Sequence, residues 1–261
     1  MGYHVRVDFC KLLILAILFS SSLSIPSYAQ DSAAQIIQDL DRRYYYPQRL
    51  GLASLSAAIE WEQLDSVTQS GRYLRNPDVN FHWDSARGRA GANFQIIDKS
   101  FEISETRKAE LMSILENYEE VVIPQTLAER VSRYQGEVKI SRGHKKLIQF
   151  VHPNPDNNGI QKYEFYVDLD QGLIPRLRFH QNRSPYEVRS DIRYTQKDGK
   201  WLVAESRSRF QMGGVDYTET LEYTYRQTKG FWLIGKMTQT VETGDRIVQS
   251  FIFRFKDYQI N

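Results

Sequence analysis

The residues best suited to chemistry in this 261-residue sequence are the four histidines beyond its first 29 residues: His82, His144, His152 and His180. They lie far apart in the chain, and none stands in the His-Glu-x-x-His spacing by which one helix face holds zinc. His82 and Asp84 flank Trp83, so a strand would place both side chains on one face, where they could hold an ion. The same alternation is equally typical of a solvated strand. We therefore predict no metal site and no cofactor.

Nucleophiles and paired carboxylates are the other routes to catalysis. The sequence has no Gly-x-Ser-x-Gly elbow and no glycine-rich phosphate loop, and its single cysteine, Cys10, lies near the N-terminus. Glu187 or Asp191 could meet Glu205 across neighbouring strands, but nearby arginines make surface ion pairs the better interpretation. We expect a protein that is not an enzyme, with a hydrolase as the less favoured alternative.

The elements that would position these residues are long antiparallel strands between Leu173 and Asp257. Apolar and polar residues alternate there with a period of two, as in strands with one buried face. Turns with glycine, such as Met212-Gly213-Gly214, divide the stretch into strands of about 10 to 13 residues, which is longer than usual. Long strands with one apolar face predict an α+β protein built on a strongly curved antiparallel sheet with a concave side to fill.

The alternation also assigns faces to individual residues. Over 201–212 it places Val203 on the side of Glu205, and over 231–242 it places Leu233 with Met237. Six alternating arginines would form the opposite, wet face, in contact with water or with anionic lipid headgroups: Arg176, Arg178, Arg189, Arg193, Arg207 and Arg209.

Aromatic residues are abundant, with 16 Tyr, 13 Phe and 4 Trp. One interpretation is β-propensity and core packing, which aromatic residues serve in any sheet. The other is a concave apolar wall that holds an acyl chain or a similar ligand. The residues predicted to form such a wall are Leu177, Phe179, Val188, Ile192, Tyr194, Val203, Val215, Tyr217, Leu221, Tyr223, Phe231, Leu233, Met237, Phe251 and Phe253.

Helices are predicted upstream of the long strands. Apolar residues recur at helical spacing over 33–46, where Pro47 ends the pattern, and again from Ser104 to Tyr118 and over 127–131. The 52–61 run fits a strand or a helix, 65–78 fits a loop, and 79–84 and 92–97 fit two paired strands. The helical residues expected to cover the sheet are Ile36, Ile37, Leu40, Tyr44, Leu111 and Leu115.

The N-terminus has the pattern of a secretory signal peptide over residues 1–29. Arg6 and Lys11 precede an apolar run over 12–19, and Ser27-Tyr28-Ala29 ends it with small residues. The alternative, a membrane anchor, needs a longer apolar run. We predict cleavage after Ala29, a periplasmic or secreted location, and a single domain over 30–261 without disulfides. Lys+Arg 34 against Asp+Glu 32 argues against a nucleic-acid partner.

This order of elements resembles the LolA-like superfamily of lipoprotein carriers and outer-membrane lipoprotein-sorting proteins. The leader, the N-terminal helix, the early strands, the helical insertion at 104–133 and the long meander match in order. The phrases 217–223 (Tyr-Thr-Glu-Thr-Leu-Glu-Tyr) and 230–233 (Gly-Phe-Trp-Leu) look like strands of that family's sheet. The resemblance implies a half-barrel, helices over its open apolar side, a cavity for acyl chains, and no catalysis.

These expectations together describe a carrier or binding protein of the cell envelope. The partner would be a lipid, a lipoprotein acyl chain or another apolar ligand in the concave face of the sheet. The alternative is an envelope protein-interaction module that needs no small ligand. After cleavage of the leader the chain would not span the membrane.

Overall fold

The computed structural model describes residues 32–65, 71–87, 92–97, 103–154 and 159–261. Their contacts form one compact unit, from Ser32 to Asn261. The leader predicted for residues 1–29, with its cleavage site and Cys10, lies outside the described residues. Within the described ranges, no helix combines the length and the apolar composition that a membrane span requires.

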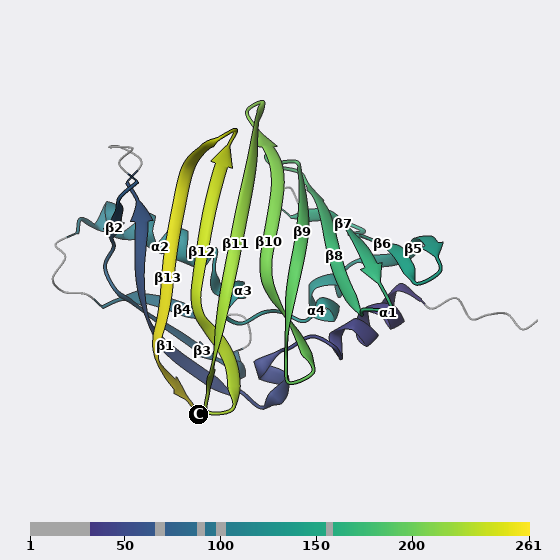
Figure 1. Cartoon of the computed structure of the whole chain (residues 1–261), viewed down its shortest axis with the longest axis horizontal. Helices are drawn as coiled ribbons and strands as arrows, with labels where there is room; N and C mark the ends of the chain where they lie inside the picture. The colour runs from purple at the N-terminus through teal and green to yellow at the C-terminus, as the bar shows by residue number, and fades with distance from the viewer. Residues whose placement is uncertain (1–31, 66–70, 88–91, 98–102, 155–158) are drawn as a thin grey trace, which may run out of the picture. The chain divides into compact units, whose positions relative to one another are not determined.

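The unit is built on one curved, open antiparallel sheet of 13 strands that carries short helices on one face (Figure 1). The strand order is β4-β3-β1-β13-β12-β11-β10-β9-β8-β7-β6-β5, and β2 pairs with β1. From β5 to β13 each strand therefore pairs with the next one in the sequence, and β1 adds to the far side of β13. The α+β class and the curved sheet predicted from the sequence are confirmed.

The elements have these bounds. The strands are β1 (Ser54–Leu64), β2 (Tyr73–Arg75), β3 (Val79–Asp84), β4 (Asn93–Ile96), β5 (Gln135–Arg142), β6 (Lys145–Val151), β7 (Ile160–Asp168), β8 (Leu173–Gln181), β9 (Glu187–Lys197), β10 (Lys200–Met212), β11 (Val215–Thr228), β12 (Phe231–Thr243) and β13 (Arg246–Ile260). The helices are α1 (Ala33–Asp41), the 3-10 turn η1 (Pro47–Leu50), α2 (Glu105–Glu116), α3 (Glu119–Val122) and α4 (Leu127–Val131).

The long strands and their turns follow the sequence pattern. β11 has 14 residues and β13 has 15, so the predicted length is confirmed and slightly exceeded. Between β10 and β11, Gly213 and Gly214 both have positive φ, and Met212 pairs directly with Val215. A two-residue turn of this kind suits the twist of the strands that it joins.

A β-bulge in β10 corrects the face predicted for Val203. Val203 lies opposite Tyr194 of β9, whereas Glu205 lies opposite Arg193. The two-residue step from Val203 to Glu205 on β10 thus lies opposite a one-residue step on β9. As a result, the side chains of Val203 and Glu205 lie on opposite faces of the sheet. The strict alternation predicted over 201–212 is wrong at this point.

A second register shift, in β12, skips Gly235. As a result Ile234, and not Leu233, lies opposite Tyr225 on the side that carries Met237. The prediction that Leu233 and Met237 share one face is therefore wrong, although both residues are buried. Bulges leave no clear signal in the hydrophobic pattern, because apolar residues stand on both sides of the shift.

The chain between α1 and η1 also differs from its prediction. The helix expected over 33–46 is shorter, and the backbone that follows it pairs with β10. Tyr45 N donates to Trp201 O at 2.9 Å, and Trp201 N donates to Arg43 O at 2.9 Å. These groups of β10 are available because its pairing with β11 begins only at Glu205. A long-range contact has thus overridden the local helical pattern.

The other upstream elements follow the predictions, except that the loop predicted over 65–78 contains a short strand. The ambiguous 52–61 run forms the strand β1, and part of the predicted 65–78 loop forms β2 beside it. Ser104 caps α2 through its side chain, and Thr126 forms a capping box with Glu129 at α4. Each cap satisfies backbone N–H groups that a short helix would otherwise leave unpaired.

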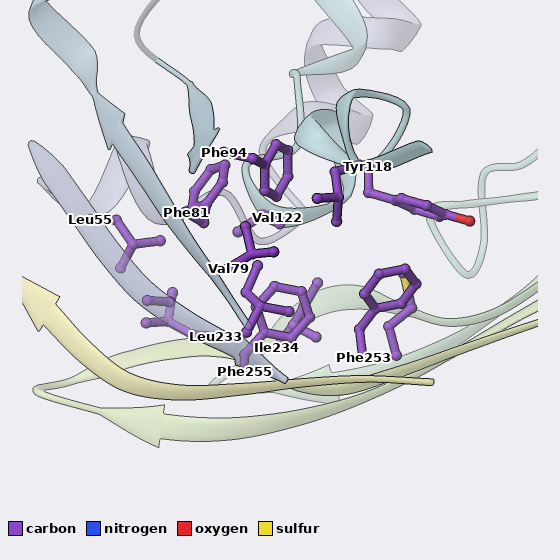
Figure 2. Packing of buried hydrophobic residues seen from close by; sticks show 14 of the residues in the cluster. Leu55, Val79, Phe81, Phe94, Tyr118, Val122, Leu233, Ile234, Phe253 and Phe255 are labelled. Carbon is purple, nitrogen blue, oxygen red and sulfur yellow. The ribbon is translucent and has the colours of Figure 1, made fainter. Parts of the chain in front are cut away.

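Two hydrophobic clusters lie between the sheet and its helices. The large cluster packs α2 and α3 onto β1, β3, β4, β12 and β13, with Trp61, Phe251 and Phe253 fully buried. Figure 2 shows this packing, in which the rings of Tyr118 and Phe253 lie 4.9 Å apart. The small cluster packs α1 and α4 onto β6, β7 and β8 around Phe165.

Candidate functional site

Between the two clusters, the helix-bearing face of the sheet crosses β9, β10 and β11. Phe210 lies opposite both Val188 and Tyr217, and Val203 lies opposite Tyr194. Among the described residues, several apolar side chains on this face belong to neither cluster, and six of them lie between Trp201 at one end and the β10–β11 turn at the other. We call them the middle strip: Val188, Ile192, Tyr194, Val203, Phe210 and Tyr217.

The middle strip is less buried than the clusters on either side. Val188 is buried, but the other five residues keep part of their surface accessible. The rings of Phe210 and Tyr217 stack on each other, with their centroids 5.7 Å apart and their planes 16° from parallel. This part of the strip therefore presents a flat aromatic surface. Partly exposed apolar side chains on a face that is otherwise closed by helices are the surface on which an apolar ligand would gain most.

A row of polar residues crosses the strip. Ser190 and Ser208 are buried and face each other with their hydroxyl oxygens 2.8 Å apart. Glu219 follows Ser208 in register on β11 and accepts a hydrogen bond from Gln239 of β12. Tyr118 donates to the Gln239 side chain at 2.6 Å. The polar groups of this row are thus satisfied within the protein, as burial requires.

A tyrosine from the segment after α1 closes one end of the strip. Tyr44 donates to the Tyr194 hydroxyl at 3.2 Å, and Tyr194 donates to the backbone oxygen of Ile174 at 2.8 Å. Burial raises the pKa of Tyr44 to about 12 and also raises the pKa of Tyr194. Both hydroxyls therefore stay neutral at physiological pH and act as fixed hydrogen-bonding groups.

A pocket of about 990 Å³ reaches β7, two strands from β9 of the strip. The 119–134 segment, which contains α3 and α4, forms one side, and the remaining walls come from η1, from Trp83 at the end of β3 and from the β6–β7 hairpin. Tyr163 of β7 lines the pocket and lies opposite Phe179, with their rings 6.3 Å apart. Phe179 lies opposite Val188. The pocket and the middle strip are thus joined by one cross-strand row.

The pocket lining mixes apolar and charged side chains. Arg130 donates to Glu120 at 2.8 Å. Burial raises the pKa of Tyr163, and the neighbouring Arg130 opposes that rise. Burial raises the pKa of Glu119, helped by the charges of Glu116 and Glu120. A ligand with an apolar body and a polar end would find a matching surface on both parts of this site.

One amide in the pocket wall is only half satisfied. The Gln48 amide nitrogen donates to Pro124 O at 2.6 Å, while its oxygen is buried without a hydrogen-bond partner. The opposite orientation of the amide would bring two acceptor oxygens together, so the contact with Pro124 fixes it.

Several predicted wall residues are used by the protein's own packing. Leu233, Met237, Phe251 and Phe253 are buried in the large cluster. Other predicted wall residues pack at the margins of the clusters: Leu177, Phe179, Leu221, Tyr223 and Phe231. Val215 is 42% exposed at the β10–β11 turn. Five of the predicted residues remain in the middle strip, which adds Phe210 from the same face.

The predicted covering residues lie where helices meet the sheet. Ile36, Ile37 and Leu40 of α1 are buried in the small cluster, and Leu111 and Leu115 of α2 are buried in the large one. Tyr44, the last of the predicted set, contacts the strip itself through Tyr194, with the rings 5.5 Å apart. Whether any of these residues contacts a ligand stays a prediction.

The histidines do not assemble a reactive site. No group of three or more His, Cys, Asp or Glu side chains in the described part of the chain could hold a metal ion. His82 lies 3.0 Å from the Ser56 hydroxyl, and Asp84 accepts from Ala86 N at 2.9 Å. His144 lies 3.0 Å from Asp170. His152 lines the pocket.

The paired carboxylates make ion pairs, as the sequence suggested. Asp191 contacts Arg176 at 3.0 Å and Arg209 at 3.1 Å. Glu205 contacts Arg193, and Glu187 contacts Arg189. All of these lie on the outer face of the sheet, away from the helices, so they act as surface pairs of modest strength.

Asp41 is a structural residue that the sequence predictions missed. Its buried carboxylate accepts from Leu127 N at 2.8 Å and from Ala128 N at 2.9 Å, which caps α4, and from the Tyr46 hydroxyl at 2.7 Å. A signal was present, because Asp41 falls four residues after Ile37 on the apolar side of α1. A carboxylate in such a position needs donors that come from elsewhere in the chain.

Comparison with known proteins adds a fold-level likeness. No family model matches the chain, and no curated protein does. A LolA superfamily protein from Nitrosomonas europaea shares 9% identity over 88% of this chain and 94% of its own, with a TM-score of 0.33. A putative outer membrane lipoprotein-sorting protein domain from Vibrio parahaemolyticus shares 11% identity over 88% of this chain and 92% of its own, with a TM-score of 0.31. A DUF1329 family protein from Desulfovibrio piger shares 9% identity over 88% of this chain and 94% of its own, with a TM-score of 0.34.

The first of these structures is described as a member of the superfamily that the sequence resembles. Because the identities and TM-scores are so low, we infer function from this chain's own side chains.

Proposed function

We propose that this protein is a non-catalytic carrier that holds an elongated apolar ligand, such as a lipid or a lipoprotein acyl chain. The apolar body of the ligand lies along the middle strip, and its polar end lies in the pocket. One observation carries the proposal: the strip belongs to neither core cluster, yet it continues in register through Phe179 to Tyr163 in the pocket wall.

The physical gain comes from covering apolar surface that the protein leaves partly exposed. A ligand that buries about 300 Å² of apolar area would gain about 7 kcal/mol at ~25 cal/mol per Å², before the costs of ordering it. The large cluster offers no comparable gain, since Met237, Phe251 and Phe253 are already buried by their neighbours. Binding to the strip therefore needs no disruption of the core.

An envelope location fits this role and follows from the leader predicted for residues 1–29. A carrier that shields acyl chains from water is needed where such chains must cross an aqueous compartment. We propose the periplasm for the mature chain. Mass spectrometry after expression with the leader would reveal whether the mature N-terminus follows Ala29.

The ligand site is tested with a fluorescent fatty-acyl probe and a matched pair of variants. Phe210→Glu places a charge on the strip, whereas Gln211→Glu places one on the opposite face of the same strand. We expect the unmodified protein and Gln211→Glu to bind the probe alike, and Phe210→Glu to bind it at least about tenfold more weakly. Circular dichroism and thermal melting establish that both variants fold.

Two results would count against the carrier. A delipidated preparation that binds no acyl probe contradicts it directly. A protein partner that is captured equally well by the delipidated protein would instead favour an interaction module without a small ligand. Loss of a hydrolytic activity in a His82→Ala/Asp84→Ala double variant would point to the enzyme alternative.

A further inference from the structure

Exposed apolar side chains gather at one end of the sheet. The turns after β8, β10 and β12 share this end, because successive strands run in opposite directions (Figure 1). Four large apolar residues at these turns have between 41% and 67% of their surface exposed. We call them the hairpin rim: Tyr186, Met212, Val215 and Ile247.

The hairpin rim continues the middle strip. Met212 follows Phe210 by two residues on β10, and Val215 precedes Tyr217 by two residues on β11. Met212 and Val215 lie directly opposite each other, one step beyond the stacked pair of Phe210 and Tyr217. Because side chains two apart share a face of a strand, an apolar path leads from the helix-covered face to the exposed end. Tyr186 stands in the adjacent turn.

A row of cations lies just behind the rim on the outer face. Arg178, Arg189 and Arg209 lie directly opposite one another across β8, β9 and β10. Each is the sequence neighbour of a residue in the apolar row that contains Val188 and Phe210. Like charges placed opposite each other are unfavourable on their own, so this row needs anions to balance it.

The protein supplies only part of that balance. The three rows nearest the rim hold five arginines and three carboxylates on β8–β11: Arg176, Arg178, Arg189, Arg207 and Arg209 against Glu187, Asp191 and Asp216. The flanking strands add Lys162 and Glu164 of β7 and Glu242 of β12, so six cations stand against five carboxylates, and Arg178 contacts Glu164 at 3.5 Å. Arg189 contacts Glu187, and Arg209 contacts Asp191 at 3.1 Å. A positive excess therefore remains beside the exposed apolar end.

We propose that the hairpin rim docks on the surface of a lipid bilayer that contains anionic lipids. Tyr186, Met212 and Val215 enter the interface between headgroups and acyl chains, where tyrosine is favoured. The arginine row meets lipid phosphates at the same depth, and its long side chains reach toward the headgroups. Apolar side chains at the tip, with cations just behind them, match the layering of a bilayer surface better than that of a protein partner.

This docking rests on exposure and register, and it does not depend on the ligand proposed for the middle strip. If both hold, the rim is the end by which an acyl chain passes between membrane and strip without crossing water. If the strip binds nothing, the rim still binds vesicles.

The test is flotation of the purified protein with vesicles of phosphatidylcholine alone and with added phosphatidylglycerol. We expect binding to the mixed vesicles, weakened by salt. Combining Tyr186→Ser, Met212→Ser and Val215→Ser should reduce binding by about tenfold or more, in proportion to the apolar area lost. Arg189→Gln and Arg209→Gln should each reduce it about fivefold on the mixed vesicles only.

Two exposed apolar residues away from this end provide the matched control. Leu50 in η1 is 54% exposed and Ile140 in β5 is 46% exposed. Leu50→Ser/Ile140→Ser should leave vesicle binding unchanged. Equal loss in this control, or full binding by the triple rim variant, overturns the proposal.

Inorganic phosphate at matched ionic strength separates the two sources of anion. No more inhibition than by chloride supports docking on lipid headgroups. Complete displacement by phosphate at low concentration would show a site for the free anion and contradict bilayer docking.

Discussion

The large cluster and the middle strip face the same side of one sheet, yet they differ in what covers them. In the cluster, α2 and α3 close over β12 and β13, and Phe253 stacks on Trp61 with ring centroids 5.5 Å apart. In the strip, residues such as Phe210 keep accessible surface, and small buried serines separate them. The difference shows that one strand pattern can form a closed hydrophobic core in one place and leave an accessible apolar surface in another.

The largest expected effect is a difference in stability loss between the large cluster and the middle strip. Phe253→Ala should destabilise the fold by about 3–5 kcal/mol, because it opens a cavity in a closed core. Phe210→Ala should cost only about 1–2 kcal/mol, since part of that side chain is already exposed. Urea unfolding followed by circular dichroism measures both. Equal losses would mean that the strip is as much a part of the core as the cluster.

The next effect concerns the helices that close the small cluster. Asp41→Ala removes a buried carboxylate that caps α4, and it leaves Leu127 N and Ala128 N without their acceptor. We expect a loss of about 2–3 kcal/mol. Asp39→Ala, which changes an exposed residue on the same helix, serves as the control in the same unfolding experiment. A loss no greater than that of the control would show that α4 is held by packing alone.

A smaller effect is expected in the polar row of the strip. Ser208→Ala breaks a buried hydrogen bond with Ser190 and should cost about 1 kcal/mol. The double change Ser190→Ala/Ser208→Ala should cost less than the sum of the two single changes, because no buried hydroxyl remains unpaired. Additive losses would show that each serine is satisfied independently of the other.

The smallest effect is a pH dependence in the pocket. Burial and neighbouring carboxylates raise the pKa of Glu119 above its usual 4.5. The folded state therefore holds this proton more strongly than the unfolded state, and stability falls as the pH rises through that raised pKa. Glu119→Gln should remove this dependence and raise stability at neutral pH by a few tenths of a kcal/mol at most. Melting temperatures between pH 4 and pH 7, as a rough window around that pKa, measure it. An unchanged pH profile in the variant would assign the effect to other groups.

The regular parts of the fold were predictable because they follow from local patterns. Alternation over 173–257 and glycine turns such as 213–214 determine the meander, and Ser104 marks the start of α2. The ion pairs of Asp191 and Glu205 were predictable for the same reason, since the register places arginines beside them.

The remaining features depend on contacts that no local pattern contains. The bulge beside Val203 and the pairing of Tyr45 with Trp201 are decided by the whole sheet. The pocket joins Gln48, Trp83 and Tyr163, which are far apart in the sequence. Most importantly, alternation could not distinguish wall residues that the helices cover, such as Phe253, from those that they leave accessible.

A photoreactive fatty acid tests the central claim most directly. The delipidated protein is mixed with a diazirine-bearing acyl chain, irradiated and digested, and the labelled peptides are identified by mass spectrometry. We predict labels on β9, β10 and β11, around Val188, Phe210 and Tyr217, and few on β12 and β13. Labels concentrated around Phe251 and Phe253, or no labelling above that of an unrelated soluble protein, would contradict the account.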